Sequence, residues 1–205
     1  MFARAIVGMA VAGVLLAEVH GCRTPLDSER AKALSAAELQ EYAKDGDATA
    51  QFNLGRCYYN GEGVAMDRSE AARWFRKAAG QEYPEAQTML GACYCTGEGV
   101  AVDKAEAVKW FRIAAEHGYP PAQTMLGACY LKGEGVAVDK AEAVKWFRMA
   151  AGQGHPPTQA MLGMCYLNGE GVAVDKAEAV KWFRKAAEQG YLPAQEALKI
   201  LQAPE

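Results

Sequence analysis

Apolar and polar residues alternate with a helical period along most of this chain. Between residues 84 and 96, apolar side chains fall at i, i+4, i+7 and i+8, which is one face of an α-helix. These side chains are Ala86, Leu90, Cys93 and Tyr94. A second amphipathic stretch follows, and its buried stripe consists of Ala107, Trp110, Phe111 and Ala114. The pattern therefore predicts pairs of helices, each with one apolar face.

This two-helix pattern recurs every 36 residues. The most regular markers of the period are Trp74, Trp110, Trp146 and Trp182, and also Gly55, Gly91, Gly127 and Gly163. A fixed period between about 20 and 50 residues is typical of solenoids and other repeat arrays. We therefore predict an all-α fold with four helix-turn-helix units, at residues 47–83, 84–119, 120–155 and 156–191.

Turn and capping residues recur with the same period. A Gly-Glu-Gly sequence separates the two helices of each unit, and an aspartate then precedes the second helix. These aspartates are Asp67, Asp103, Asp139 and Asp175, and each is followed three residues later by Glu, as in a helix N-cap. The glycine inside each first helix costs about 1 kcal/mol relative to alanine. Its recurrence predicts that two helices approach closely there.

Both ends of the array need capping elements, because terminal repeats of a solenoid otherwise expose a core surface. Ser35 and Glu38 have the spacing of a capping box, which predicts an N-terminal capping helix at residues 35–46. A last first-helix pattern begins near Pro193, which predicts a C-terminal capping helix at residues 192–205. Polar residues and Pro25 indicate a tether at residues 22–34.

Residues 1–21 have the pattern of an export signal. Arg4 precedes an uncharged apolar run, Ala5–Ala17, whose 13 residues are too few to span a bilayer. The sequence Val-His-Gly-Cys that ends at Cys22 resembles a bacterial lipobox, although His20 departs from that pattern. We expect the chain to be exported to the periplasm or the envelope, with a lipid on Cys22. A plain cleaved signal and an uncleaved N-terminal anchor helix are the alternatives.

Composition and candidate reactive groups favour binding over catalysis. The net charge of −3 argues against a nucleic-acid-binding surface, which is normally strongly basic. Cys57, Cys93, Cys129 and Cys165 share one repeat position on the buried face, too far apart between units for disulfides. His117 and His155 lie at non-equivalent loop positions without a ligand cluster, so no metal or cofactor is expected.

The repeat itself resembles a known family. The pattern Ala-Gln-x-x-Leu-Gly-x-Cys-Tyr-x-x-Gly-Glu-Gly-Val-x-x-Asp-x-x-x-Ala-x-x-Trp-Phe-Arg-x-Ala-Ala resembles the Sel-one-like repeat (SLR) family, which is related to tetratricopeptide repeats. The resemblance covers roughly residues 47–202. It implies a right-handed α-solenoid that acts as an adaptor in macromolecular assembly, and in bacteria often an exported one. Cysteine-rich members pair each first-helix cysteine with a second cysteine in the other helix, where this chain has none.

The resemblance implies a monomeric scaffold that binds a protein or peptide in a concave groove. A structural envelope spacer without a specific ligand is the alternative. Some bacterial members carry a β-lactamase attribution, but none of the three serines, Ser28, Ser35 and Ser69, has Lys three residues later, so we do not expect an enzyme.

Positions at which the four copies differ indicate where a partner could bind. On a helical wheel they lie opposite the core face of the first helix, and several are apolar. The candidate partner-binding residues are Phe52, Arg56, Tyr59, Thr88, Cys95, Thr124, Leu131, Met164 and Leu167. The alternative is that first helices of adjacent units bury this strip against each other.

The lipobox resemblance can be tested by labelling cells with an alkyne fatty acid. We expect the label on the wild-type protein and not on Cys22→Ser, because only the cysteine thiol accepts the lipid. Equal labelling of both proteins, or a mature N-terminus at another residue, would contradict the prediction.

Overall fold

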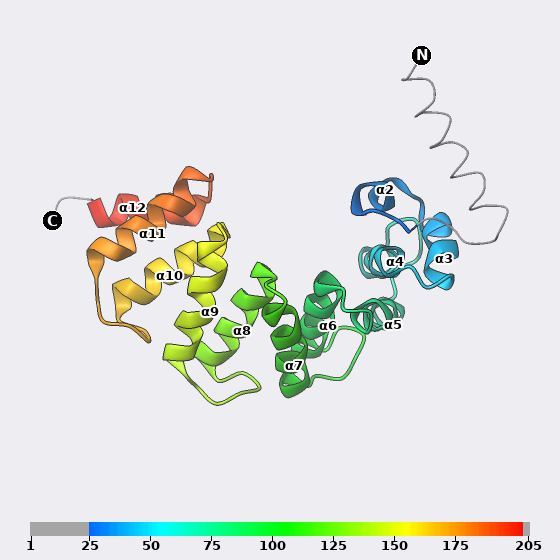
Figure 1. The fold of residues 1–205 in the computed structure, drawn as a ribbon, viewed down its shortest axis with the longest axis horizontal. Coiled ribbons are helices and arrows are strands. Elements are labelled where there is room, and N and C mark those ends of the chain that lie inside the picture. Colours follow the sequence, from blue (N-terminus) through cyan, green and yellow to red (C-terminus); the bar gives the residue numbers. More distant parts are fainter. Residues whose placement is uncertain (1–24, 203–205) are drawn as a thin grey trace, which may run out of the picture.

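The computed structural model describes residues 25–202, and all regular structure in that range is helical. The helices are α2 (Ser28–Ala33), α3 (Ala36–Lys44), α4 (Ala48–Asn60), α5 (Arg68–Ala79), α6 (Pro84–Thr96), α7 (Lys104–Glu116), α8 (Pro120–Lys132), α9 (Lys140–Gly152), α10 (Pro156–Asn168), α11 (Lys176–Glu188) and α12 (Leu192–Gln202). They follow one another along an arc whose two ends lie on the same side (Figure 1). The predicted all-helical solenoid is confirmed.

Each unit pairs a first helix with a second helix: α4 with α5, α6 with α7, α8 with α9, and α10 with α11. Sequence dictates where these helices begin and end. Pro84 begins α6, where its missing N–H costs nothing, and Gly97 ends it with a left-handed φ of 80°. A side-chain oxygen of Asp103 accepts a hydrogen bond from the Glu106 N–H at 2.9 Å and caps α7. Asp67, Asp139 and Asp175 do the same at the other second helices, which confirms the predicted N-caps.

A phenylalanine ring lies against the glycine of the first helix in every unit. A Cβ atom added to Gly91 would lie 2.6 Å from Cε1 of Phe111, which is much closer than real Cβ contacts. Gly55, Gly127 and Gly163 have the same relation to Phe75, Phe147 and Phe183. All four rings are fully buried. The predicted close approach is confirmed: the ring lies nearest, and at Gly127 the Ala143 carbonyl oxygen of the second helix would also lie 3.1 Å from the added Cβ.

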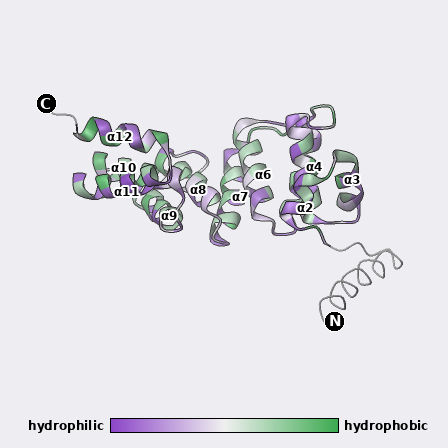
Figure 2. Ribbon diagram, turned by 90° about the horizontal axis from the view of Figure 1, so that it is seen from above, coloured by the Kyte–Doolittle hydropathy of each residue, from purple (hydrophilic) through white to green (hydrophobic). Residues whose placement is uncertain are grey.

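The core lies across the boundaries between units. One buried cluster joins Phe111 of α7 to Leu126 of α8, the first helix of the following unit, and Trp146 of α9 packs against it. Trp110 and Trp182 pack in the same way on the clusters that precede them. Trp74 is buried in the cluster formed by α2, α3 and α4. The tryptophans therefore bind each unit to the unit before it. In Figure 2 the apolar segments recur along the whole array.

The Gly-Glu-Gly turns also hold successive units together. Gly99 has a φ of 75°, and a Cβ atom there would lie 1.9 Å from the Arg68 carbonyl oxygen at the start of α5. Beside it, the Arg68 guanidinium lies 3.1 Å from the Glu98 carboxylate. The pairs Lys104–Glu134 and Lys140–Glu170 repeat this ion pair at 3.3 and 3.1 Å. These ion pairs are half exposed, so each adds little to stability. They recur at equivalent positions between successive units.

The predicted N-terminal capping helix is confirmed as α3. Ser35 and Glu38 form the full capping box, in which Ser35 N–H donates to the Glu38 carboxylate at 2.9 Å. The Gln51 side chain donates to the Ala43 carbonyl at 3.1 Å, and Gln87 and Ala79 repeat this bond one unit later. Counting back 36 residues therefore equates α3 with a second helix, and Leu39 of α3 with Phe75.

The predicted tether at residues 22–34 is wrong for the part that the structure describes. Leu26 is buried, and its N–H donates to Asp47 at 2.8 Å. Asp27 caps α2, and Ala31 of that helix is also buried. Two apolar residues within a charged stretch suffice to anchor the helix, and composition alone concealed them. The predicted signal segment and Cys22 lie outside the described residues. Within residues 25–202, no helix has the length and apolar character to cross a membrane.

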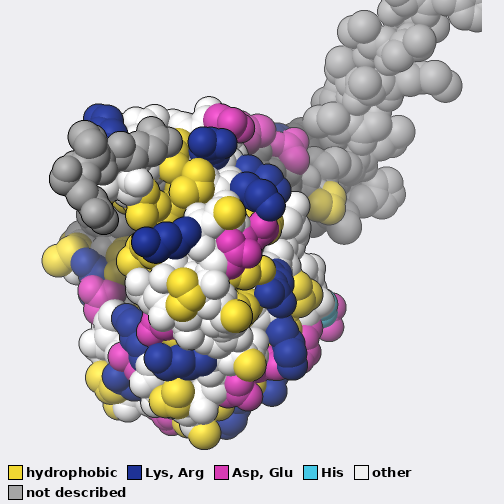
Figure 3. All heavy atoms as spheres, turned by 90° about the vertical axis from the view of Figure 1, so that its left-hand side faces the viewer, with side chains coloured by type: hydrophobic (Ala, Val, Ile, Leu, Met, Phe, Trp, Pro, Cys, Tyr) yellow, Lys and Arg dark blue, Asp and Glu magenta, His cyan; other side chains and the backbone are white. Residues whose placement is uncertain are grey.

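At the other end, α12 continues the pattern of a first helix. Ala194 is buried, and Gln195 donates to the Ala187 carbonyl at 3.2 Å, as the glutamines of earlier units do. Lys199, however, stands 36 residues after Gly163, where a second helix would need room for its phenylalanine. Leu192 and Ile200 are exposed. In the view onto this end, hydrophobic side chains lie interspersed with Lys and Arg (Figure 3).

Candidate functional site

The predicted partner-binding strip divides into two parts in the structure. Phe52 lies in the first part, between neighbouring units, with ring centroids 5.9 Å from Phe75 and 5.2 Å from Tyr83. Tyr59 donates a hydrogen bond from its hydroxyl to the Glu98 carboxylate of the next unit. Its ring also lies under the Arg68 guanidinium, 3.7 Å from the ring centroid. Both aromatic residues therefore hold the first two units together.

The threonines of the strip are satisfied within the array. Thr88 and Thr124 each donate to the carbonyl four residues earlier, at 2.8 and 2.9 Å. Thr124 is buried and also shares a hydrogen bond with Thr158 of the next first helix. His155 Nδ1 lies 2.6 Å from the Thr158 hydroxyl, and burial lowers the pKa of His155. This is a polar contact between α8 and α10, and its threonines are not available to a partner.

Three further residues of the strip pack on clusters of the following unit. Cys95 lies against the α7–α8 cluster, Leu131 against the α9–α10 cluster, and Leu167 against the cluster of α11 and α12. All three are half-buried. Of the two interpretations of the strip, burial between adjacent units accounts for these residues. The sequence-based view of Leu131 and Leu167 as an outward-facing apolar surface is therefore corrected.

Arg56 and Met164 form the second part of the strip and are exposed, whereas their equivalents on α6 and α8, Ala92 and Ala128, are half-buried. One turn earlier, on the same side of each first helix, lies another set of equivalent positions. We call the eight residues at these two positions the open face: Asn53, Arg56, Met89, Ala92, Met125, Ala128, Met161 and Met164. Met125 and Met164 are 38% and 44% exposed, which is unusual for apolar side chains in the centre of a helix.

Sequence reasoning missed Asn53 and the three methionines that replace it. A helical wheel considers one helix in isolation, and on it the position of Asn53 lies close to the predicted core side. A signal was present, however, because the first copy carries Asn and Arg at the open face where the others carry Met with Ala or Met.

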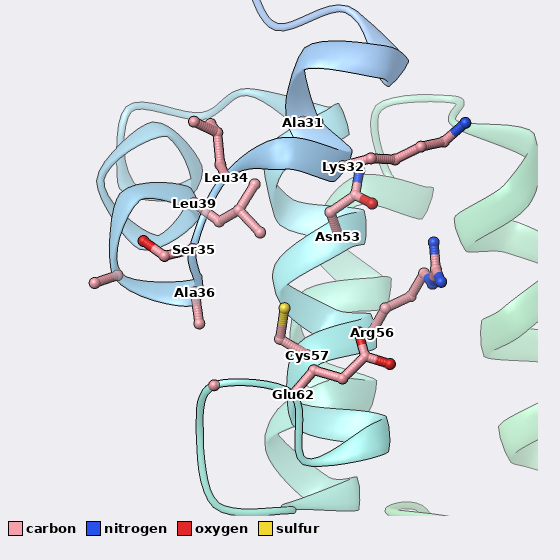
Figure 4. A pocket seen from close by; sticks show the side chains of 12 residues that line it. Ala31, Lys32, Leu34, Ser35, Ala36, Leu39, Asn53, Arg56, Cys57 and Glu62 are labelled. Atoms are coloured by element: carbon pink, nitrogen blue, oxygen red, sulfur yellow. The ribbon is translucent and has the colours of Figure 1, made fainter.

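A pocket of about 580 Å³ lies at the N-terminal end of the open face, between α2, α3 and α4. Figure 4 shows Ala31 and Lys32 above it and Cys57 and Glu62 below it. Its apolar lining is formed by Ala31, Leu34, Ala36, Ala37, Leu39, Cys57 and Gly63. Its polar lining is formed by Lys32, Ser35, Asn53, Arg56 and Glu62.

The charges of this pocket are only partly paired. Lys32 lies 2.6 Å from Glu29, and Glu62 accepts a hydrogen bond from Asn60 at 2.8 Å. Arg56 has no hydrogen bond or ion pair with any residue in the described part of the chain. The buried Asn53 amide donates to the Thr49 carbonyl at 2.9 Å, which fixes its orientation.

Nothing in this arrangement points to covalent chemistry. Burial raises the pKa of Cys93, Cys129 and Cys165 to about 11, so these thiols are protonated at neutral pH and are poor nucleophiles. Burial also raises the pKa of Cys57, the thiol of the pocket. Among residues 25–202, no group of His, Cys, Asp and Glu side chains could hold a metal ion. The open face and the pocket can bind a ligand by apolar contact and charge.

Comparisons with known proteins agree with this geometry. The family model described as Sel1 repeat matches residues 48–83, 84–119, 120–155 and 156–191. No curated protein matches the chain.

Solved structures give the same result. A protective antigen of uropathogenic Escherichia coli with an SLR fold is 45% identical, with a TM-score of 0.77 over 80% of this chain, and this chain spans 35% of that antigen. A Sel1 repeat protein from Oxalobacter formigenes is 32% identical, with a TM-score of 0.76, over 92% of this chain and 72% of the other. An immunity protein from Pseudomonas aeruginosa is 25% identical, with a TM-score of 0.58, over 83% and 70% of the two chains.

The division of the strip leads to a stability prediction. Leu131→Asp places a carboxylate against the α9–α10 cluster and should lower the free energy of unfolding by about 2–4 kcal/mol. Met125→Asp on the open face is the matched control, and we expect it to cost less than about 1 kcal/mol, mainly through helix propensity. Urea unfolding followed by circular dichroism measures both. Equal losses for the two variants would place Leu131 on a free surface.

Proposed function

Because this chain belongs to the Sel1 repeat family, we propose that it is a scaffold that holds a protein or peptide partner on its open face. Sel1 repeat proteins are generally protein-interaction scaffolds. The observation that carries the proposal for this chain is the partly exposed row of methionines on three successive first helices. A row that crosses unit boundaries suits an elongated partner better than a small molecule.

Physical chemistry supports binding on this row. Exposed apolar side chains gathered on one face of a protein mark interaction sites more often than isolated ones do. Methionine is flexible and polarisable, so it adapts to irregular partner surfaces. Ala92 and Ala128 lie between the methionines. Their side chains are short, so a partner segment can approach the backbone of the helices.

We further propose that the scaffold has no enzymatic activity, is monomeric and works in the bacterial envelope. Buried, protonated thiols and the lack of a metal-binding group among the described residues support the first point. The export pattern before residue 22 and the lipobox resemblance at Cys22 support the location. In that arrangement α2 would follow the lipid-bearing residue after a few residues, which would hold the pocket close to the membrane surface.

Photo-crosslinking in cells of the source organism tests the open face. A benzophenone amino acid placed at Met125 should form an adduct with one defined partner. The matched control is the same amino acid at Met149 of α9, a methionine that is 48% exposed on a second helix. Met164→Asp in the Met125 probe protein should reduce the adduct at least severalfold, because it introduces a charge on the same face.

The outcome separates the two functions that the sequence left open. An adduct from position 125 that is absent from position 149 supports a scaffold with a specific partner. Equal adducts from both positions, or none from position 125, would contradict the proposal and favour a spacer without a specific ligand.

A further inference from the structure

The N-terminal pocket lies between α2, α3 and α4, where the described elements depart from the 36-residue pattern. By the 36-residue period, α2, which has 6 residues, matches residues 64–69, the end of a connection and the start of a second helix. The match of the first helix α4 is residues 12–24, which lie outside the described residues. Helix α3 has 9 residues and follows α2 after a connection of only Leu34 and Ser35. Among the described residues, the lower part of α4 therefore lies beside α2 and α3 and not beside another first helix.

The packing around the four equivalent cysteines differs between this end of the array and the later units. In later units, a side chain of the preceding first helix packs on the cluster that contains the cysteine: Tyr59 for Cys93, Cys95 for Cys129, and Leu131 for Cys165. These three cysteines are 1%, 4% and 2% exposed, whereas Cys57 is 9% exposed and lines the pocket. The pocket is therefore the place of one aliphatic or aromatic side chain that the described residues do not supply.

Charged side chains at the pocket restrict the kind of ligand that could bind there. By the 36-residue period, Lys32 corresponds to Arg68, and Glu62 to Glu98, which form an ion pair one unit later. The pocket separates Lys32 and Glu62, and Lys32 pairs with Glu29 instead. Lys32 and Arg56 extend to the same side of the pocket, away from Leu34 and Leu39 (Figure 4). One end of the pocket is thus apolar, and the other end carries a guanidinium that pairs with no described residue.

Asn53 and Arg56 occur only in the unit that lines the pocket. Unit two has Met89 and Ala92 at these positions, and the later units also have apolar residues there. The repeat geometry therefore does not require a polar pair. An exposed arginine with no partner among the described residues, beside a buried amide and an apolar cavity, is an arrangement suited to a carboxylate attached to an apolar group.

We propose that this pocket binds the C-terminal residue of a protein partner, with an aliphatic side chain on the apolar lining and the terminal carboxylate at Arg56 and Lys32. This proposal rests on the proposed scaffold function. It specifies the contacts that would bind the C-terminal end of the partner. Leu131, which fills the corresponding place in unit four, shows that a leucine side chain suits such a site. Apolar lining at one end and cations at the other fit a chain end, which carries one side chain and one carboxylate, better than a chain that passes through.

Titration with N-acetyl-L-leucine tests the pocket without knowledge of the partner. The full-length protein, labelled with ¹⁵N, is observed by NMR, and N-acetyl-L-leucinamide serves as the uncharged control ligand. We expect saturable shifts at the Asn53 side-chain amide and at the backbone amides of Ala36 and Cys57. Affinity should be roughly millimolar, as is usual for a ligand of this size. The amide should bind about tenfold more weakly, because it lacks the charge-assisted hydrogen bonds.

Variants of the chain sharpen the test. Arg56→Gln should weaken binding about tenfold, whereas Arg184→Gln, at an exposed arginine of α11, should leave it unchanged. Asn53→Met combined with Arg56→Ala copies unit two, so it should fold normally and lose the carboxylate preference. The reverse change in unit two, Met89→Asn with Ala92→Arg, should not create a second site, because Tyr59 already packs on the cluster that contains Cys93.

Several results would overturn the assignment. They are no saturable shift up to 20 mM ligand (about tenfold above a Kd of roughly 2 mM), equal binding of the acid and the amide, or equal effects of Arg56→Gln and Arg184→Gln. Octanoate tests the source of the carboxylate. If it binds more tightly than N-acetyl-L-leucine and depends on Arg56, the pocket recognises fatty acids and not peptide ends. Failure of this titration together with a specific adduct at position 125 would leave the scaffold proposal intact.

Discussion

The fold depends on one repeated contact, in which a buried phenylalanine ring occupies the space that a missing glycine Cβ leaves on the first helix. Phe111 against Gly91 is representative, with 2.6 Å from the ring to the place of a Cβ. The same rings lie in clusters that include the next first helix, so one side chain packs on both its own unit and its neighbour. In such an array, stability is roughly a sum of unit terms and nearest-neighbour terms. Here these rings, together with the tryptophan that packs on each cluster, supply much of the stabilisation between neighbouring units.

This packing determines which surface is free to bind. A first helix contacts its own second helix, the preceding second helix, and the first helices on both sides, so only a narrow stripe stays open. Asn53 and Arg56, with their equivalents, lie on that stripe. At its N-terminal end, α2, α3 and α4 enclose a pocket with an apolar end and a cationic end. The open face therefore follows from the regular stacking of the units, and the pocket lies where the described chain departs from that regularity.

The sequence predicted most of the fold because the same local structural signals recur in each copy of the repeat. The aspartate caps, the internal glycines and the capping box at Ser35 each encode a local geometry that four copies or one strong motif make visible. The binding surface was predicted less well. A helical wheel for one helix cannot show that Leu131 faces the next unit, because that contact depends on how units stack. The helix α2 and its pocket were not predictable from periodicity, since they arise where the period is broken and the buried anchors, Leu26 and Ala31, stand alone in a charged stretch.

A pair of glycine substitutions tests the central contact most directly. Gly127→Ala puts a Cβ atom 2.5 Å from the Phe147 ring, whereas Gly152→Ala, also in a helix, meets nothing within 4 Å. Urea unfolding of the two variants should show opposite signs. Gly127→Ala should lose about 1–3 kcal/mol through overpacking, and Gly152→Ala should gain about 0.4–1 kcal/mol through reduced entropy of the unfolded chain. If Gly127→Ala is as stable as Gly152→Ala, the ring does not need the glycine, and the contact does not hold the array together.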